Sequence, residues 1–221
     1  MLTKEKKTPW DKTKDLLDHY HMEFGNHWSY NFRNDPKRLG FVLSRYKFAA
    51  KMASKKQKVL ELGCSDGIGS TILAEQAVSY TGVDYDPLAI EAAKKNLQGG
   101  KWHFICDDFM EKSYGQFDAI VSMDVIEHIL PEFEDQYLQT IVSNLSSEGI
   151  CVIGTPNITA SAYASVGSQI GHVNLYSQDR FVQSLQKYFH QVLPFGMNDE
   201  ILHTGYAPMC HYLICVACLK K

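Results

Sequence analysis

Acidic side chains close several apolar segments of this chain of 221 residues, and their positions predict a binding site. One segment ends at Asp84, the next at Asp107 and Asp108, and another at Asp124. Packing near a core favours apolar residues at such places, so acids at all of these ends indicate a ligand. The two oxygens of a carboxylate can accept hydrogen bonds from both hydroxyls of a ribose. We therefore predict a nucleoside site, with Asp84 at the ribose.

A glycine-rich loop comes before the first of these acids. The apolar segment Val59–Leu62 runs directly into Gly63–Gly69, whose first, fifth and seventh residues are glycines. Dinucleotide-binding loops have the spacing G-x-G-x-x-G instead, and they place a pyrophosphate at a helix N-terminus. Glu61 and Asp66 are poor neighbours for a pyrophosphate but suit a cationic ligand. S-adenosylmethionine has an ammonium, a sulfonium and a ribose but no phosphate, so we predict it in preference to NAD.

The pattern of apolar residues predicts the elements that position this site. Segments with strand and helix periodicity alternate, which implies a mainly parallel sheet covered on both faces, with ligands at the carboxyl ends of its strands. The expected fold is α/β: a doubly wound, seven-stranded, mainly parallel sheet of Rossmann-like type, with an antiparallel C-terminal strand and an N-terminal helical cap. Strands are expected at 59–62, 79–83, 102–106, 117–123, 150–153, 191–195 and 211–219, and helices at 68–77, 87–96, 132–145 and 177–189.

The cap is predicted to be residues 1–57, and it is expected to form one compact unit with the domain at 58–221. Helices are expected at 11–24 and 37–53. Between them, the aromatic and polar segment Asn26–Pro36 is expected to be a loop. Polar and basic side chains of the cap could bind an anionic group: Tyr30, Arg33, Lys37, Arg38 and Arg45.

Composition narrows the classes of partner. The chain is 45% hydrophobic and 21% charged with a net charge of −3, values that fit an ordinary globular domain. Its pI of about 6.3 argues against nucleic acid or an anionic membrane as a partner. No apolar run approaches the roughly 20 residues of a membrane-spanning helix, and the N-terminal residues do not resemble a secretory signal. We therefore expect a cytoplasmic enzyme.

Four segments together resemble the ordered motifs of class I S-adenosylmethionine-dependent methyltransferases. The resemblance extends from about residue 58 to residue 156, and it implies both the fold and the cofactor. The family pattern has a glycine where this chain has Ser65, so the backbone conformation of the loop at that residue is left open. The four segments are Val59–Gly69, Gly82–Pro87, Asp107–Phe109 and Phe117–Ser122.

The resemblance also implies which residues contact the cofactor. Asp84 would hold the ribose hydroxyls, and Tyr85 would lie beside the adenine. Asp108 would accept a hydrogen bond from the adenine amino group, with Asp107 as the alternative one residue earlier. Further contacts are expected from the loop and from the strand ends beside the methionine part: Glu61, Gly63, Cys64, Gly67, Phe109, Ser122 and Met123.

The segment Asp124–His128 resembles the acidic-x-x-Glu-His segment of ubiquinone-type O-methyltransferases and of small-RNA 3′-end methyltransferases. In those relatives the segment lies at the substrate mouth and can bind a divalent metal. Glu127 and His128 are therefore candidate metal ligands, with Asp124 and His172 as further candidates. Asp124, His128 and His172 are also the candidate catalytic residues, since an imidazole can take the proton of a substrate hydroxyl. A purely structural role for either histidine stays open.

These observations predict a methyltransferase that acts on a small molecule, most simply at a hydroxyl oxygen. The overall layout, including Gly171–Asn174, resembles bacterial methyltransferases that modify sugars or capsule. The acceptor would then be a sugar, a phospho-sugar or a capsule precursor in polysaccharide biosynthesis, and an anionic group on it would suit the basic residues of the cap. The alternatives are RNA 3′-end methylation and a module that binds S-adenosylmethionine without catalysis. The acceptor's identity and the oligomeric state are left open.

Overall fold

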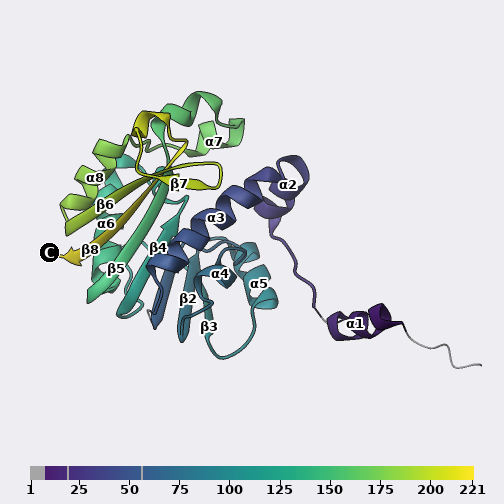
Figure 1. The fold of residues 1–221 in the computed structure, drawn as a ribbon. Helices are drawn as coiled ribbons and strands as arrows, with labels where there is room; N and C mark the ends of the chain where they lie inside the picture. Colours follow the sequence, from purple (N-terminus) through teal and green to yellow (C-terminus); the bar gives the residue numbers. More distant parts are fainter. Residues whose placement is uncertain (1–7, 19, 56) are drawn as a thin grey trace, which may run out of the picture.

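A computed structural model describes residues 8–18, 20–55 and 57–221, and in it most of the helices surround a single sheet (Figure 1). The sheet has eight strands in the order β3-β2-β1-β4-β5-β8-β6-β7. The strands are β1 (Lys58–Leu62), β2 (Ser79–Asp84), β3 (Trp102–Cys106), β4 (Phe117–Met123), β5 (Leu145–Pro156), β6 (Phe189–Asn198), β7 (Ile201–His203) and β8 (Tyr212–Lys220). The helices are α1 (Pro9–Leu17), α2 (Asn26–Asn34), α3 (Lys37–Met52), α4 (Ser70–Leu73), α5 (Pro87–Asn96), α6 (Glu134–Asn144), α7 (Val166–Gly171) and α8 (Gln178–Gln186).

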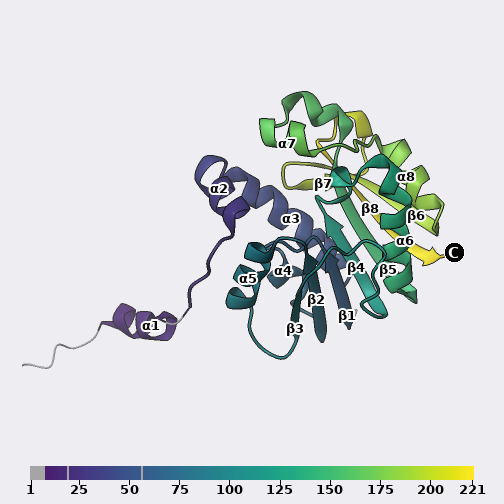
Figure 2. The ribbon, with the colours of Figure 1, turned by 180° about the vertical axis from the view of Figure 1, so that it is seen from behind.

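Helices cover both faces of the sheet, as the alternating pattern predicts. Strands β1 to β5 pair in parallel, while β8 pairs antiparallel with both β5 and β6. Successive residues of β1 point to opposite faces, so Val59 joins the core under α3, α4 and α5 and Leu60 joins the core under α6 and α8. Figure 2 shows α6 and α8 on the face opposite α3. The predicted Rossmann-like fold class is confirmed.

The strand count differs from the prediction by one. Strand β7 pairs antiparallel with β6 over three residues, inside the segment that was expected to connect the last two strands. Three residues are too few to show the alternation by which a strand is recognised. The prediction of an antiparallel C-terminal strand is confirmed by β8.

The predicted loop at Asn26–Pro36 is wrong, because Asn26–Asn34 forms helix α2. Its two buried residues, Trp28 and Asn31, are three apart and so share one face. The helix has few apolar residues and no side-chain cap, so tertiary packing outweighs its sequence preference. Two other helices are shorter than predicted: α1 ends at Leu17, and α4 covers only Ser70–Leu73.

Helix α3 brings the N-terminal segment against the sheet. Val42, Tyr46 and Ala49 on one face of α3 are buried in the same core as Val59 of β1. The division of the chain at residues 57 and 58 stays a prediction. Within the described ranges, no helix is long and apolar enough to cross a membrane, and the predicted cytoplasmic location is not tested by that observation.

Candidate functional site

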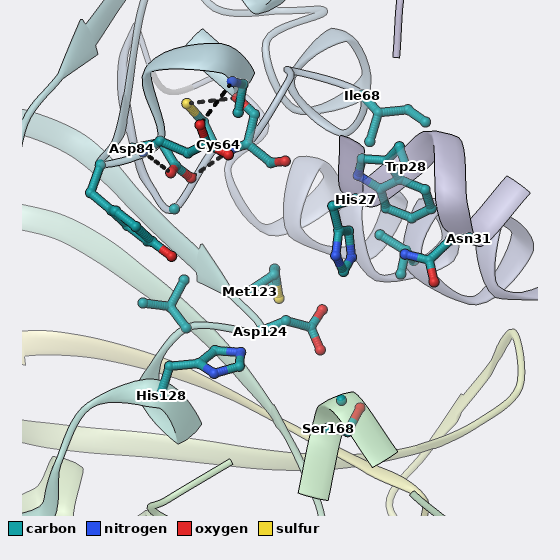
Figure 3. A pocket seen from close by; sticks show the side chains of 18 of the residues that line it. His27, Trp28, Asn31, Cys64, Ile68, Asp84, Met123, Asp124, His128 and Ser168 are labelled. Atoms are coloured by element: carbon teal, nitrogen blue, oxygen red, sulfur yellow. Dashed lines mark hydrogen bonds between the residues drawn. The ribbon is translucent and has the colours of Figure 1, made fainter. Parts of the chain in front are cut away.

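A cavity of about 760 Å³ lies at the carboxyl ends of the central strands, where the parallel sheet places its ligands. This volume suits a small-molecule site. Strand β1 is the switch point, because β2 lies on one side of it and β4 on the other. The opposite wall comes from α2, α3 and α7, which contribute His27, Arg38 and Ser168 among others. Figure 3 shows His27 and Ser168 on this wall.

The glycine-rich loop after β1 forms one end of the cavity, which we call the cofactor end. Gly63 has φ +80°, and a Cβ there would stand 2.2 Å from Cγ2 of Val125, so only glycine fits. Ser65 has φ +49° and therefore takes the left-handed conformation that glycine usually provides. Its backbone N–H donates to Oδ2 of Asp84 at 2.8 Å. Serine at position 65, where the family pattern has glycine, therefore keeps the left-handed conformation, and its N–H holds the loop to Asp84.

Asp84 ends β2 and lines the cofactor end. Its Oδ1 accepts from the backbone N–H of Asp86 at 3.0 Å, in addition to the bond from Ser65. Each carboxylate oxygen has a second lone pair, so both can still accept from a ribose hydroxyl. Tyr85 follows it and lines the same space, with 77% of its surface exposed.

Glu61 lies beneath the cofactor end, and within the described ranges it does not line the cavity. It is fully buried, and it accepts from the hydroxyls of Tyr46 at 2.6 Å, Ser70 at 2.9 Å and Tyr80. Burial raises the pKa of its carboxyl group above the ordinary value. Tyr46 does line the cavity, so Glu61 is connected to the cavity wall by its hydrogen bond from the Tyr46 hydroxyl.

The other predicted cofactor residues fall into two groups. Those that line the cavity are Gly63, Cys64, Asp84, Tyr85, Phe109 and Met123. Those that do not, among the residues described, are Glu61, Gly67, Asp107, Asp108 and Ser122. Asp107 accepts from the Tyr114 hydroxyl at 2.9 Å, and Asp108 accepts from the Met110 N–H at 3.1 Å. Contacts between these residues and a cofactor stay predictions.

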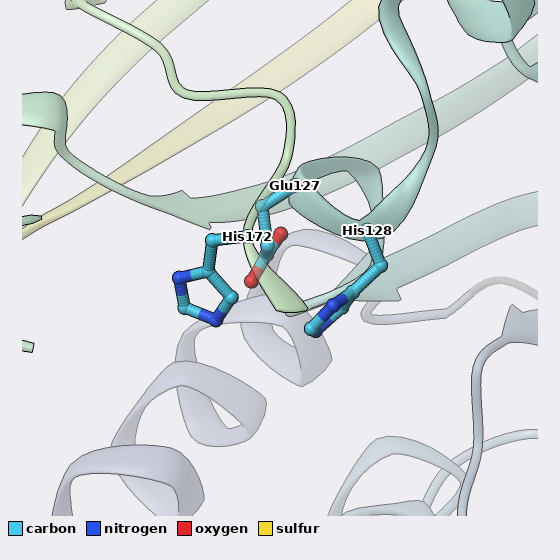
Figure 4. Close-up of side chains that lie close together, drawn as sticks. All are labelled: Glu127, His128 and His172. Atoms are coloured by element: carbon cyan, nitrogen blue, oxygen red, sulfur yellow. The ribbon is translucent and has the colours of Figure 1, made fainter. Parts of the chain in front are cut away.

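Three side chains converge at the other end, which we call the acceptor end (Figure 4). One ligand atom from each of Glu127, His128 and His172 lies within 4.8 Å of the others. Nδ1 of His128 is 2.8 Å from the Gly171 carbonyl oxygen, so Nδ1 is the donor, and in the neutral imidazole the lone pair is on Nε2. Burial, followed by the charge of His128, lowers the pKa of His172. Both imidazoles can therefore act as ligands or as proton acceptors.

Glu127 is fully buried, and only one of its two carboxylate oxygens has a hydrogen-bond partner among the described residues. Oε2 accepts from Oγ1 of Thr155 at 3.0 Å, while Oε1 has no partner among the described residues. Burial, followed by the charge of Asp124, raises the pKa of Glu127 to about 8. Its carbonyl oxygen accepts from the N–H groups of Val173 at 2.8 Å and Asn174 at 3.1 Å, which ties the segment that carries His172 to Glu127.

Asp124 lines the cavity, but its carboxylate forms an ion pair with Arg45. Nη1 of Arg45 is 2.9 Å from each carboxylate oxygen, and the guanidinium lies 3.6 Å from the ring centre of Tyr212. Both carboxylate oxygens of Asp124 therefore already have a charged partner within the protein. The predicted catalytic role of Asp124 stays a prediction.

Comparison with known proteins agrees with this arrangement. The family model described as a methyltransferase domain matches residues 33–191. The chain belongs to the methyltransferase-domain family. The predicted resemblance to class I S-adenosylmethionine-dependent methyltransferases is thereby confirmed, and the matched span includes both ends of the cavity from Arg38 to His172.

Individual relatives of this methyltransferase are more distant. The ubiquinone biosynthesis O-methyltransferase of Psychrobacter arcticus is 28% identical over 148 residues, which is 63% of this chain and 57% of that protein. The chain thus spans little more than half the length of this curated relative. The N-methyltransferase NodS of Bradyrhizobium japonicum, solved with S-adenosyl-L-homocysteine, has 16% identity and a TM-score of 0.65 over 96% of this chain and 99% of that one.

A further solved structure with the same fold is the methyltransferase domain of bacterial CtHen1-C. It has 17% identity and a TM-score of 0.66, covering 82% of this chain and all of that one (100%). At such identities, the solved structures show the shared fold of the methyltransferase and nothing about its acceptor.

The acceptor end of the methyltransferase has a donor set that fits a divalent cation. One carboxylate and two imidazoles are a common ligand combination for such ions. Oε1 of Glu127 is an orphaned buried oxygen, and the Gly171 carbonyl fixes the tautomer of His128, as an outer-shell partner does in many metal sites. Asp124 falls outside the set, because Arg45 holds its carboxylate.

Sequence reasoning missed most of the wall opposite the sheet. His27, Trp28 and Asn31 line the cavity from α2, which was expected to be a loop. Of the cap residues singled out for an anionic group, Tyr30 and Arg38 line the cavity. Within the described part of the chain, Arg33 and Lys37 do not, and Arg45 pairs with Asp124. The spacing of Trp28 and Asn31 was the one available signal for a helix there.

Proposed function

We propose that this methyltransferase uses S-adenosylmethionine to methylate a hydroxyl oxygen of a small-molecule acceptor, for which a sugar, phospho-sugar or capsule precursor is our first candidate. The observation that carries the proposal is that His128 and His172 line the same cavity as the glycine-rich loop, with the buried Glu127 carboxylate beside them. A cofactor end and a set of proton-accepting side chains in one enclosed space are what hydroxyl methylation needs.

The cofactor end supplies binding and orientation. When bound, S-adenosylmethionine provides an electrophilic methyl group on its sulfonium sulfur. Asp84 would accept hydrogen bonds from the ribose hydroxyls, and Met123 would lie by the methionine part. Arg38 is the one lysine or arginine among the lining residues described, so we propose that its guanidinium pairs with the carboxylate of that part.

The acceptor end supplies the handling of the hydroxyl proton. Nε2 of His128 keeps a lone pair, because the contact to Gly171 places the proton on Nδ1. That nitrogen can take the proton of an acceptor hydroxyl as methyl transfer occurs. His172 lies beside it, with ring centres 5.0 Å apart, and its lowered pKa keeps it neutral and able to accept a proton too.

The same residues support a metal-assisted variant of this reaction. A divalent cation, when bound, would polarise the hydroxyl oxygen and make its proton more acidic. Glu127, His128 and His172 would hold it. His128 cannot use Nε2 both as ligand and as base, so the two variants assign its lone pair to different tasks.

RNA 3′-end methylation is the second candidate. The cluster at the acceptor end favours it, because the acidic-x-x-Glu-His segment resembles the one in small-RNA 3′-end methyltransferases. A net charge of −3 and a single arginine among the described lining residues are unfavourable for a phosphate backbone.

The deciding experiment is an acceptor screen with methyl-labelled S-adenosylmethionine. Glucose 1-phosphate, uridine diphosphate glucose, catechol and a short RNA would be assayed with chelator and then with Mg²⁺, Mn²⁺ or Zn²⁺. His128→Ala should lower the rate of transfer at least about 100-fold, and His190→Ala, an exposed histidine that does not line the cavity, should not. Full activity in chelator would exclude the metal-assisted variant. Tight S-adenosylhomocysteine binding without transfer to any acceptor would indicate a module that binds the cofactor only.

A further inference from the structure

Helix α2 presents to the cavity a side-chain amide whose nitrogen has no hydrogen-bond partner in the described part of the chain. Asn31 is 5% exposed and lines the cavity, and its Nδ2 has no hydrogen-bond partner among the described residues. A buried donor without a partner destabilises a protein, whereas an apolar residue of the same shape would not. Asparagine at this position therefore costs stability in the free protein, and a ligand with an acceptor oxygen would recover it.

The position of Asn31 relates it to the acceptor end. His27 lies one helical turn before Asn31 on the same face of α2, and both line the cavity. Burial lowers the pKa of His27, and the charges of Arg38, Asp124 and His128 all reach its ring. Figure 3 shows His27 extending from α2 into the space above Asp124, with His128 on the far side. A molecule held between His27 and His128 would thus lie one turn of α2 from the Asn31 carboxamide.

The other polar groups of the wall do not satisfy Asn31. Ser168 of α7 lines the cavity, but its hydroxyl accepts a hydrogen bond from Ser165 at 3.0 Å. Asp124 is held by Arg45. Nδ2 of Asn31 thus has no hydrogen-bond acceptor among the described residues of this wall, so an oxygen of a bound molecule would be its partner.

We propose that the Asn31 carboxamide determines acceptor specificity by donating a hydrogen bond to an oxygen of the methyl acceptor other than the one methylated. The inference rests on the proposed function and adds the class of group recognised: a hydroxyl, carbonyl or carboxylate oxygen. Helical neighbours four apart are separated by about 5–6 Å, so an acceptor that contacts both His27 and Asn31 carries polar groups at two places on a ring-sized unit. A polyhydroxylated ring meets that requirement.

The test compares Asn31→Leu with Asn144→Leu. Asn144 is also buried, but its carboxamide bonds Tyr114, Lys112 and Thr140 away from the cavity. Asn31→Leu should raise the melting temperature by about 2–4 °C, because it removes an unpaired buried donor. Asn144→Leu should lower it, because it leaves satisfied groups without partners. A fall in melting temperature for Asn31→Leu would mean that Asn31 is structural and would overturn the inference.

Function is measured on the same variant with whichever of glucose 1-phosphate, uridine diphosphate glucose and catechol the wild type methylates fastest. We expect kcat/KM to fall about tenfold or more, with S-adenosylhomocysteine affinity unchanged in calorimetry. A weaker S-adenosylhomocysteine affinity would assign Asn31 to the cofactor, and an unchanged kcat/KM would remove it from acceptor recognition. If the wild type methylates none of the three, the proposed function fails, and the inference fails with it.

Discussion

Two buried glutamates lie under the two ends of the cavity, and their surroundings differ. Glu61 and Glu127 are both 0% exposed, and burial raises the pKa of both carboxyl groups. Both oxygens of Glu61 accept hydrogen bonds from hydroxyl groups of the protein. Oε1 of Glu127 accepts none from the described residues. The same residue type at the same burial thus has a complete set of partners at the cofactor end and an incomplete one at the acceptor end.

The difference separates a structural carboxylate from one that is prepared for a ligand. Leaving a buried polar atom unpaired costs about 1–3 kcal/mol, so it persists only where something else requires it. Glu61 joins α3, α4 and β2 through Tyr46, Ser70 and Tyr80. Glu127 lies between two imidazoles, and one of its oxygens has no partner among the residues described. Glu61 and Glu127 are equally buried, so it is their hydrogen-bond partners that separate a structural carboxylate from a ligand-binding one.

The largest effect is expected from Glu127→Gln. A neutral amide is a poor metal ligand, so calorimetry with Mn²⁺ or Zn²⁺ should show an affinity at least about 100-fold weaker than wild type. Glu61→Gln, the matched change at the cofactor end, should leave metal affinity within a few fold. Equal metal affinity in wild type and Glu127→Gln would show that Oε1 of Glu127 is not a metal ligand. The hydrogen bonds of the two glutamates would then not distinguish a structural carboxylate from a ligand-binding one.

Asp84→Ala should have the next largest effect, on the cofactor. The variant removes the acceptor for the ribose hydroxyls and also the anchor of the Ser65 N–H. Loss of two hydrogen bonds to a charged group should weaken S-adenosylhomocysteine binding about 100-fold, as measured by calorimetry. Asp179→Ala, on α8 and outside the cavity lining, serves as the control. Undiminished affinity in Asp84→Ala would contradict the assignment of the cofactor end.

The same titration applied to Asp107→Ala and Asp108→Ala tests the predicted adenine contact. Neither side chain lines the cavity among the residues described, so we expect each to weaken binding less than Asp84→Ala does. A loss as large as that of Asp84→Ala in either variant would show that the loop after β3 closes onto the adenine when the cofactor binds.

Glu61→Gln should change how stability depends on pH. The raised pKa means that the folded protein keeps a proton on Glu61 where the unfolded chain, with its ordinary pKa near 4.5, has lost it. Wild type therefore loses stability as pH rises above about 4.5, by up to about 1.4 kcal/mol per pH unit from this group. Glu61→Gln cannot titrate, so its urea-unfolding free energy relative to wild type should rise with pH. A constant difference from pH 4.5 to 8 would show that three hydroxyl donors keep Glu61 ionised.

The cofactor end could be predicted from sequence because its residues lie at or directly after the ends of two strands, β1 and β2. Val59–Gly69 and Asp84 follow apolar segments whose periodicity is plain, and a parallel sheet brings their ends together. The Glu127–His128 pair is adjacent in sequence, and His172 was reached through family resemblance. Its position beside them depends on Asn174 and Val173, whose N–H groups donate to the Glu127 carbonyl.

The rest of the site depends on tertiary contacts that leave little trace in sequence. Helix α2 was predicted as a loop, so the wall with His27 and Asn31 was not foreseen. The partners of Glu61 come from α3, α4 and β2, and nothing in the spacing of those residues predicts that their hydroxyls meet. The pairing of Arg45 with Asp124 across 79 residues likewise follows from packing alone.

The smallest effect, and the sharpest test of the cofactor end as a preformed structure, is expected at Ser65. A residue with a Cβ in the left-handed region is strained by about 1–2 kcal/mol, while glycine there adds up to about 1 kcal/mol of unfolded-state entropy. Ser65→Gly should therefore stabilise the protein by about 1 kcal/mol or less in urea unfolding, with S-adenosylhomocysteine affinity unchanged, because the N–H that reaches Asp84 belongs to the backbone. Ser65→Val, whose branched side chain tolerates this conformation poorly, should lose both stability and affinity. If Ser65→Val matched wild type in both measurements, the loop would not hold the left-handed conformation when it binds the cofactor, and the cofactor end would be shaped by its ligand.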